Sequence, residues 1–200
     1  MAFNIDNFKS GGLTMGGARP SLFEISFAAP PSIALNNSAV GNKFTLLAEA
    51  AELPASSVAA VQVPYFGRNI KVAGDRTFAD WTVTILNDED FAIRAMLEKW
   101  HNDLNTLVSN VRLHSRPFAY KADNVIVTQF GKDGQRLRSY EFVGMFPTEI
   151  SAIQLAWDTT NQIERFTATF SYDYWKPVAA DENADFDTYS QDVEKFPGTI

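Results

Sequence analysis

The sequence predicts a mainly β fold of the α+β kind, an antiparallel barrel or pair of sheets flanked by one principal helix. Apolar and polar residues alternate from 165 to 174, as in a strand with one buried face. The pair Asp133-Gly134 is typical of a tight hairpin turn. Only the segment 87–104 has a long apolar stripe at helical spacing.

Length and composition indicate one globular domain. The chain has 200 residues, of which 46% are hydrophobic and 13% aromatic, enough for a sizeable core. It has no cysteine, which excludes disulfides and thiolate metal sites and fits a reducing cytoplasm. No apolar run reaches the roughly 20 residues of a membrane helix, and no signal peptide pattern is present, so we expect a soluble, unprocessed chain.

Charge is unevenly distributed along the chain. The net charge is −7, and residues 177–200 contribute −5 through six acidic residues and one lysine. An acidic balance argues against tight binding of nucleic acid, which depends mainly on Lys and Arg. We expect a flexible arm at 1–17, a β domain at 18–176 and an acidic extension at 177–200.

The first half of the chain reads as short extended segments and loops. We expect strands at 21–28, 58–65, 68–73 and 77–86, a loop at 30–43, and a strand or short helix at 44–51. In the strand 77–86, Phe78, Asp80, Thr82 and Thr84 point to one side, and Trp81, Val83 and Ile85 to the other.

The principal helix is expected to begin at Asn87 or Asp88, where acidic residues suit a helix N-terminus. Its apolar stripe contains Ile93, Met96, Leu97, Trp100 and Leu104. Further strands are expected at 122–130, 135–145, 151–157 and 162–175, with Pro147 as a break.

The sequence contains no recognisable catalytic or metal-binding constellation. His101 and His114 are the only histidines, and no nucleophile, metal or phosphate-loop motif occurs. We therefore predict no enzyme activity and no cofactor. The segment Gly74-Asp75-Arg76 has two interpretations, an anion-binding nest or a tight turn that pairs with a neighbouring chain.

Two segments carry a resemblance to a known family. They are VPYFGRNIKVAGDRTFADWTVTILNDEDFAIRAMLEKW at 63–100 and FPTEISAIQLAWDTTNQIERFTATFSYDYW at 146–175. Both resemble the tail tube proteins of contractile-tailed, T4-like bacteriophages, and the resemblance covers roughly Ala18 to Trp175. The family shares its fold with type VI secretion tube proteins.

The resemblance implies a structural subunit. Six subunits form a ring whose sheets join around a channel, rings stack helically into a tube, and DNA is ejected through it into the host. The implied partners are other copies of the chain, the sheath, baseplate and tail terminator proteins, and the tape measure protein and genomic DNA in the lumen. The implied location is the tail of the virion, after assembly in the host cytoplasm.

By the same resemblance, residues 68–78 project toward a neighbouring subunit or ring, and the helix covers the outer side. The expected contact residues are Arg68, Lys71, Asp75, Arg76 and Phe78. We expect the lumen to be lined by Thr82, Thr84, Thr167, Thr169 and Ser171. The extension at 177–200 departs from the family pattern. It is either a solvated tail or an arm that lies on an adjacent subunit, with Phe186, Tyr189 and Phe196 as anchors.

Other functions stay open at this point. The same tube could belong to a phage-derived injection particle or bacteriocin that carries no DNA. A soluble ligand-binding β-barrel is a more remote alternative, and it predicts a stable monomer.

Overall fold

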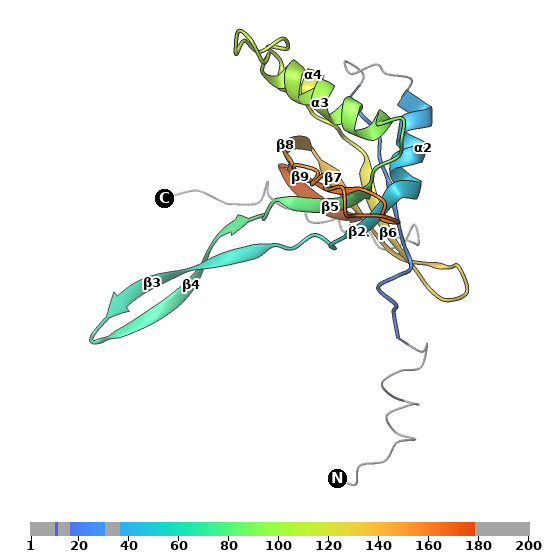
Figure 1. The fold of residues 1–200 in the computed structure, drawn as a ribbon. Helices are drawn as coiled ribbons and strands as arrows, with labels where there is room; N and C mark the ends of the chain where they lie inside the picture. The colour runs from blue at the N-terminus through green and yellow to red at the C-terminus, as the bar shows by residue number, and fades with distance from the viewer. Residues whose placement is uncertain (1–10, 12–16, 31–36, 179–200) are drawn as a thin grey trace.

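A computed structural model describes residue 11 and residues 17–30 and 37–178 of the chain. The described part contains two four-stranded antiparallel sheets, a separate two-stranded hairpin and three helices (Figure 1). The prediction of a mainly β fold with antiparallel sheets is therefore confirmed. None of the described helices has the length and apolar character needed to cross a membrane.

The first sheet has the order β1-β6-β7-β10. Its strands are β1 (Phe23–Ser26), β6 (Val125–Phe130), β7 (Arg136–Val143) and β10 (Tyr174–Val178). The predicted turn at 131–134 joins β6 to β7, and the Gly131 amide donates to the Gln135 carbonyl at 2.8 Å.

The second sheet has the order β2-β5-β9-β8. Its strands are β2 (Ala48–Ala51), β5 (Trp81–Leu86), β9 (Arg165–Ser171) and β8 (Phe146–Ile150). Trp81 of β5 and Phe142 of β7 meet between the two sheets with ring centroids 4.7 Å apart.

The predicted last strand, 162–175, is instead two strands in different sheets. β9 belongs to the second sheet, and the chain then crosses at Tyr172 and Asp173 into β10 of the first sheet. The β7–β8 connection crosses in the opposite direction at Gly144. The apolar–polar alternation continues in sequence up to Tyr174, although Tyr174 is 47% exposed at the start of β10, so sequence periodicity alone does not reveal the crossing.

Two further strand predictions were wrong around Pro147. This proline lies within β8, and residues 151–157 form a loop. β8 is an edge strand of its sheet, with a register shift between Pro147 and Glu149. A proline is tolerated there because an edge strand has backbone groups that need no ladder partner.

Helix α2 (Asn37–Leu47) begins inside the predicted loop at 30–43 and ends inside the segment 44–51, for which the sequence left strand and short helix open. Phe44 is fully buried and stacks on Phe27 with centroids 4.4 Å apart. Gly41 lies so close to the residue that follows β1 that an added Cβ would be 2.8 Å from the Phe27 carbonyl oxygen. The segment has only a weak local preference for helix, and tertiary packing supplies the additional stability that the helix needs.

Helix α3 (Ala92–Leu104) packs its predicted stripe into the core. Ile93, Met96, Leu97 and Trp100 are buried, and the Trp100 indole donates to the Tyr120 carbonyl, in the short helix α4 (Pro117–Tyr120), at 2.7 Å. The helix begins later than predicted, because Phe91 adopts a left-handed conformation with φ 51°. The carboxylates of Asp88 and Asp90 form ion pairs with Lys43 of α2.

Candidate assembly surfaces

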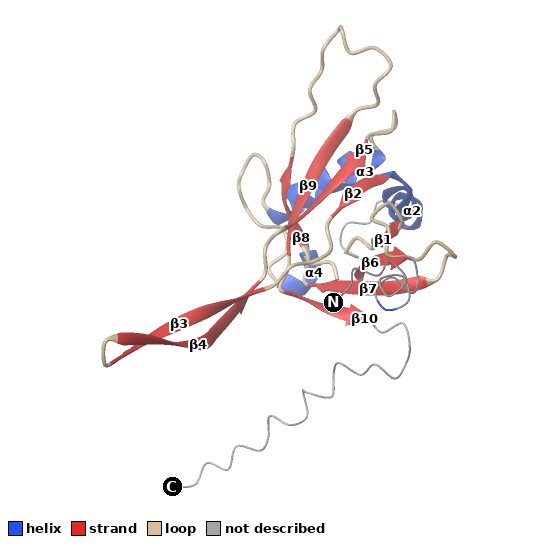
Figure 2. Ribbon diagram, turned by 90° about the horizontal axis from the view of Figure 1, so that it is seen from below, coloured by secondary structure: helices blue, strands red, loops and turns tan. Residues whose placement is uncertain are grey.

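A long hairpin is the most exposed regular element of the described chain. It consists of β3 (Ser57–Tyr65) and β4 (Arg68–Thr77), and both views show it projecting away from the two sheets (Figures 1 and 2). Its strands pair only with each other among the described residues. Every residue of β3 is exposed, as is every residue of β4 except Gly74.

The hairpin has one apolar face. Cross-strand pairing places Val63 opposite Ile70 and Val61 opposite Val72, and because side chains alternate, all four lie on the same side together with Tyr65. These five side chains are 45% to 58% exposed. The opposite face holds Gln62, Asn69 and Lys71, and the Asn69 amide donates to the Gln62 side chain at 3.1 Å.

The ends of the hairpin are defined by backbone geometry. At the tip, Phe66 and Gly67 have φ values of 42° and 81°, which fits the two-residue turn typical of twisted hairpins. Near the base, the register shifts between Val58 and Ala60, opposite Gly74 and Asp75. The tight turn predicted at Gly74-Asp75-Arg76 is therefore wrong, since these residues lie inside β4 at a bulge.

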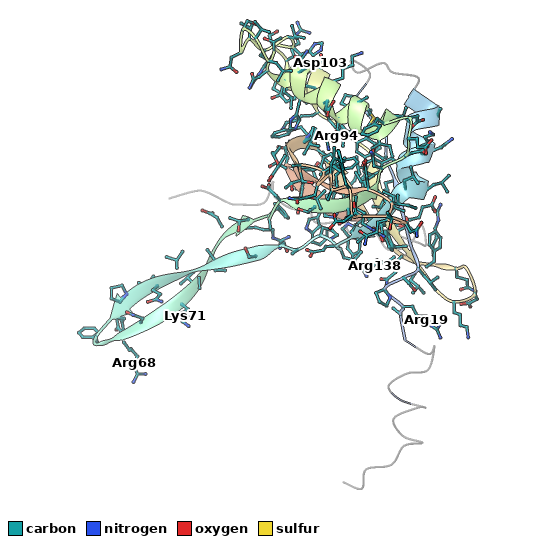
Figure 3. The ribbon with its side chains drawn as sticks, viewed as in Figure 1. Arg19, Arg68, Lys71, Arg94, Asp103 and Arg138 are labelled. Carbon is teal, nitrogen blue, oxygen red and sulfur yellow. The ribbon has the colours of Figure 1, made fainter. Side chains whose placement is uncertain are left out.

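Four of the five predicted contact residues lie along β4. Arg68, Lys71, Asp75 and Arg76 are all exposed, and Figure 3 shows Arg68 and Lys71 on the part of the hairpin that lies apart from the body of the molecule. Phe78 lies at the base of the hairpin and is half-buried. Its ring contacts Tyr172 and Trp175, with centroids 6.0 and 6.5 Å away.

The five residues predicted for the lumen lie together on one face of the second sheet. Thr82 is opposite Thr169, and Thr84 is opposite Thr167, in the β5–β9 ladder. The hydroxyls of Thr82 and Thr169 are 3.3 Å apart. Ser171 continues the same side of β9, while the other side of both strands forms the core.

Charged residues border this hydroxyl face on the neighbouring strands and at one end of β9. Among the β5 and β9 residues the only charged one is Arg165, whose guanidinium donates to both carboxylate oxygens of Glu49 at 2.6 and 3.1 Å. These hydrogen bonds lower the pKa of Glu49, while desolvation of the carboxylate acts on the pKa in the opposite direction. Glu149 of β8 lies opposite Thr169. The central strands thus present a small, uncharged, hydrogen-bonding surface.

The described residues contain no group of three or more His, Asp or Glu side chains that could hold a metal ion. Burial lowers the pKa of His101, and a hydrogen bond with the Pro147 backbone works in the opposite direction. The Nε2 atom of His101 is buried with no partner in the described part of the chain. The predicted anchors Phe186, Tyr189 and Phe196 lie outside the described residues, as does nearly all of the predicted arm at 1–17.

Two exposed apolar surfaces were missed by the sequence reasoning. The apolar hairpin face could have been found, because Val61, Val63 and Tyr65 alternate in β3 as Ile70 and Val72 do in β4. The other surface is formed by the loop between α3 and α4 together with α4, where Leu107, Val108 and Phe118 are 86% to 101% exposed. Its apolar residues have no periodicity that would indicate their exposure.

Comparison with known proteins identifies the family. A family model described as phage tail tube protein matches residues 18–177. The chain belongs to the phage tail tube protein family. The tail tube protein gp19 of Enterobacteria phage T4 is 36% identical over 160 residues, which cover 80% of this chain and 91% of the relative. The tail tube protein gp19 of Enterobacteria phage T6 is 34% identical over 160 residues, which again cover 80% of this chain and 91% of the relative.

Solved structures show the same fold in more distant proteins. A chain of the anti-feeding prophage baseplate aligns with a TM-score of 0.60 at 11% identity, covering 82% of this chain and 97% of that chain. A chain of the sheath–tube complex of an extracellular contractile injection system aligns with a TM-score of 0.55 at 13% identity. The alignment covers 89% of this chain and 99% of that chain. At these identities the likeness concerns the fold alone.

Proposed function

We propose that this protein is the repeating subunit of the tail tube of a contractile bacteriophage. Copies assemble into hexameric rings, rings stack helically, and DNA leaves the virion through the lumen. Family membership supports the tail tube assignment, since the relatives that match most of the chain are phage tail tube proteins. The subunit resides in the virion tail after assembly in the host cytoplasm.

The apolar face of the β3–β4 hairpin carries this proposal. A two-stranded hairpin without a packed face is marginal in water, and this one exposes five large apolar side chains on one side. Each half-exposed aliphatic side chain gains about 1 kcal/mol when it becomes buried. A second copy of the chain provides that burial in a head-to-tail contact, which repeats into a ring or filament.

The hairpin contact combines the apolar face with charged residues of β4. The apolar face packs against the neighbouring copy. Arg68 lies on that face opposite Tyr65, while Lys71, on the polar face, and Asp75 and Arg76, near the base, set the orientation of approach through their charge. Phe78 holds the base of the hairpin to the body through Tyr172 and Trp175. Phe78 is therefore a positioning residue, Arg68 a direct contact, and Lys71, Asp75 and Arg76 residues that act mainly through their charge.

The hydroxyl face of the second sheet is proposed as the lumen lining. Thr82, Thr84, Thr167, Thr169 and Ser171 offer neither cations nor long side chains, so they would not retain the phosphates of passing DNA. The remaining partners in this proposal are the sheath, baseplate and tail terminator proteins outside or at the ends of the tube, and the tape measure protein within it.

Neighbouring residues on opposite hairpin faces provide a matched test. Val63→Glu places a carboxylate on the apolar face, and Gln62→Glu places the same group on the polar face one residue away. We expect the Val63→Glu protein to stay folded but to form no tubes by negative-stain electron microscopy, while Gln62→Glu forms tubes like the unmodified protein. Tubes formed equally by both variants would contradict the proposed use of the apolar face.

A further inference from the structure

The loop between α3 and α4, together with α4, forms a second exposed apolar surface. We refer to residues 105–120 as the lobe. It lies beyond the end of α3, away from the hairpin (Figure 1). Leu107, Val108 and Phe118 are 90%, 101% and 86% exposed, and Val111 and Leu113 are 57% and 55% exposed.

The lobe has a defined backbone despite its exposed side chains. The Thr106 amide donates to the Val111 carbonyl at 3.0 Å, and the Asn110 amide donates to the Thr106 carbonyl at 2.8 Å. The Leu107 amide donates to the Asn102 side chain of α3 at 3.2 Å. A surface with its backbone already fixed loses less conformational entropy when a partner binds.

The lobe is also cationic. It contains Arg112 and Arg116 and no Asp or Glu. The Arg112 guanidinium lies over the Tyr120 ring at 5.3 Å, and neither arginine forms an ion pair with a carboxylate of the described residues. The lobe therefore suits a partner that is acidic and carries apolar side chains.

The C-terminal segment of the chain, residues 179–200, has this chemistry. It contains six acidic residues and one lysine, and its larger apolar residues include Phe186, Tyr189 and Phe196. An extended segment of this length reaches about 70 Å. Every subunit carries one lobe and one such segment, so the two are present in equal numbers.

The direction of β10 favours a neighbouring copy over the same copy. β10 begins next to Asp173, whose carboxylate forms an ion pair at 2.6 Å with Lys121, immediately after the lobe. The strand then leads away from α4 (Figure 2), and its five residues, Tyr174–Val178, extend about 17 Å. The chain thus leaves the described fold while moving away from its own lobe.

We infer that residues 179–200 of one subunit dock on the lobe of an adjacent subunit, through apolar contacts and carboxylate pairing with Arg112 and Arg116. This rests on the proposed self-assembly and deepens it, because it names a second surface at which copies meet. The contact links neighbouring subunits independently of the hairpin.

Because the chain contains no cysteine, disulfides in a cross-linking test can form only between introduced cysteines. Full-length Val108→Cys and Tyr189→Cys proteins are mixed under assembly conditions and oxidised gently. We expect disulfide-linked heterodimers at least about tenfold faster than from Tyr189→Cys with Leu155→Cys, since docking raises the local concentration. Leu155 is the control because it is 80% exposed and lies in a different loop.

Charge reversal in the lobe tests the proposed pairing of carboxylates with the two arginines. Arg112→Glu with Arg116→Glu, in the Val108→Cys protein, should reduce the rate to the control level, whereas Arg→Lys at both positions should preserve it. Folding of each variant is checked by circular dichroism, and raising salt to 0.5 M should slow the unmodified pair. Rates equal to the control would overturn the inference.

The single chain carrying both Val108→Cys and Tyr189→Cys separates the two possible sources of the segment. A cross-link confined to the monomer would overturn docking on an adjacent subunit, and a cross-link between subunits supports it. Electron microscopy of the same samples keeps the two proposals apart. Tubes without the cross-link contradict this inference and leave the tube proposal intact.

Discussion

At the scale of single residues, the crossing between the two sheets depends on Gly144. This residue has φ 69°, and its amide donates to the Asp123 carboxylate at 2.9 Å. An added Cβ would collide with the carboxylate of Asp173. Asp173 would have to move away, and this would disrupt its ion pair with Lys121, whose ammonium group is 2.6 Å from the carboxylate.

We therefore expect Gly144→Ala to destabilise the protein by roughly 2–4 kcal/mol, from backbone strain together with the displaced ion pair. The matched control is Gly134→Ala, where φ is 78° but nothing lies within 4 Å of the added Cβ. The control should lose only about 1–2 kcal/mol, from strain. Urea unfolding monitored by tryptophan fluorescence measures both, and equal losses would contradict a role for Asp173.

Lys43 shows how single charges join elements that are distant in sequence. Its ammonium group pairs with Asp88 at 2.9 Å and with Asp90, and these bonds raise the pKa of Lys43 and lower that of Asp90. The acidic cluster at 88–90 suggested a helix start from sequence. In the structure Asp90 accepts a hydrogen bond from the Ala92 amide, at the start of α3, at 3.1 Å. Both carboxylates also connect α2 to the turn before α3 through Lys43.

At the scale of elements, the hairpin is the part whose stability depends most on assembly. Backbone hydrogen bonds of β3 and β4 are not covered by another layer in the described subunit, so they open by local fraying. Packing of the apolar face against a neighbouring copy in a tube would suppress this fraying. The element should therefore change its dynamics on assembly much more than the sheets do.

Hydrogen exchange can measure this difference. Amides of β3 and β4 should exchange rapidly in the unassembled subunit and at least about tenfold more slowly in tubes, since each 1.4 kcal/mol of docking energy gives tenfold protection. Amides of β5 and β9, at the centre of the second sheet, serve as the internal reference and should be slow in both states. Equal exchange of the hairpin in subunits and tubes would contradict its docking.

At the scale of the whole molecule, the two proposed contacts and the proposed lumen lie on different parts of one subunit. The hairpin and the lobe project from the body, whereas the hydroxyl face belongs to the second sheet itself (Figures 1 and 2). Separate surfaces allow rings to close and stack while one sheet face stays free. The acidic net charge of −7 is compatible with a conduit that does not retain DNA.

The lumen assignment can be tested by adding positive charge. Thr169→Lys should leave tubes intact but make them bind DNA, with an affinity that falls steeply as salt rises, and DNA delivery by reconstituted particles should decrease. Ala95→Lys is the control, because Ala95 is exposed on α3, the helix expected on the outer side. If Thr169→Lys changes neither DNA binding nor delivery, the hydroxyl face does not line the lumen.

The sequence by itself determined the antiparallel β class, the stripe of α3, the β6–β7 turn and the alternating faces of β5 and β9. Each of these depends on neighbouring residues along the chain, through periodicity or turn chemistry. The family resemblance also came from the sequence, through the segments at 63–100 and 146–175, and the comparisons confirm it.

Only the tertiary structure decided the remaining features. α2 forms because Phe44 is buried against Phe27, and Pro147 stays in a strand because β8 is at an edge. The run 162–175 divides between sheets at Asp173 because Gly144 provides space at the crossing. The exposure of the hairpin and the lobe is likewise fixed by what packs against them. These features depend on contacts between residues far apart in the chain, which local patterns do not encode.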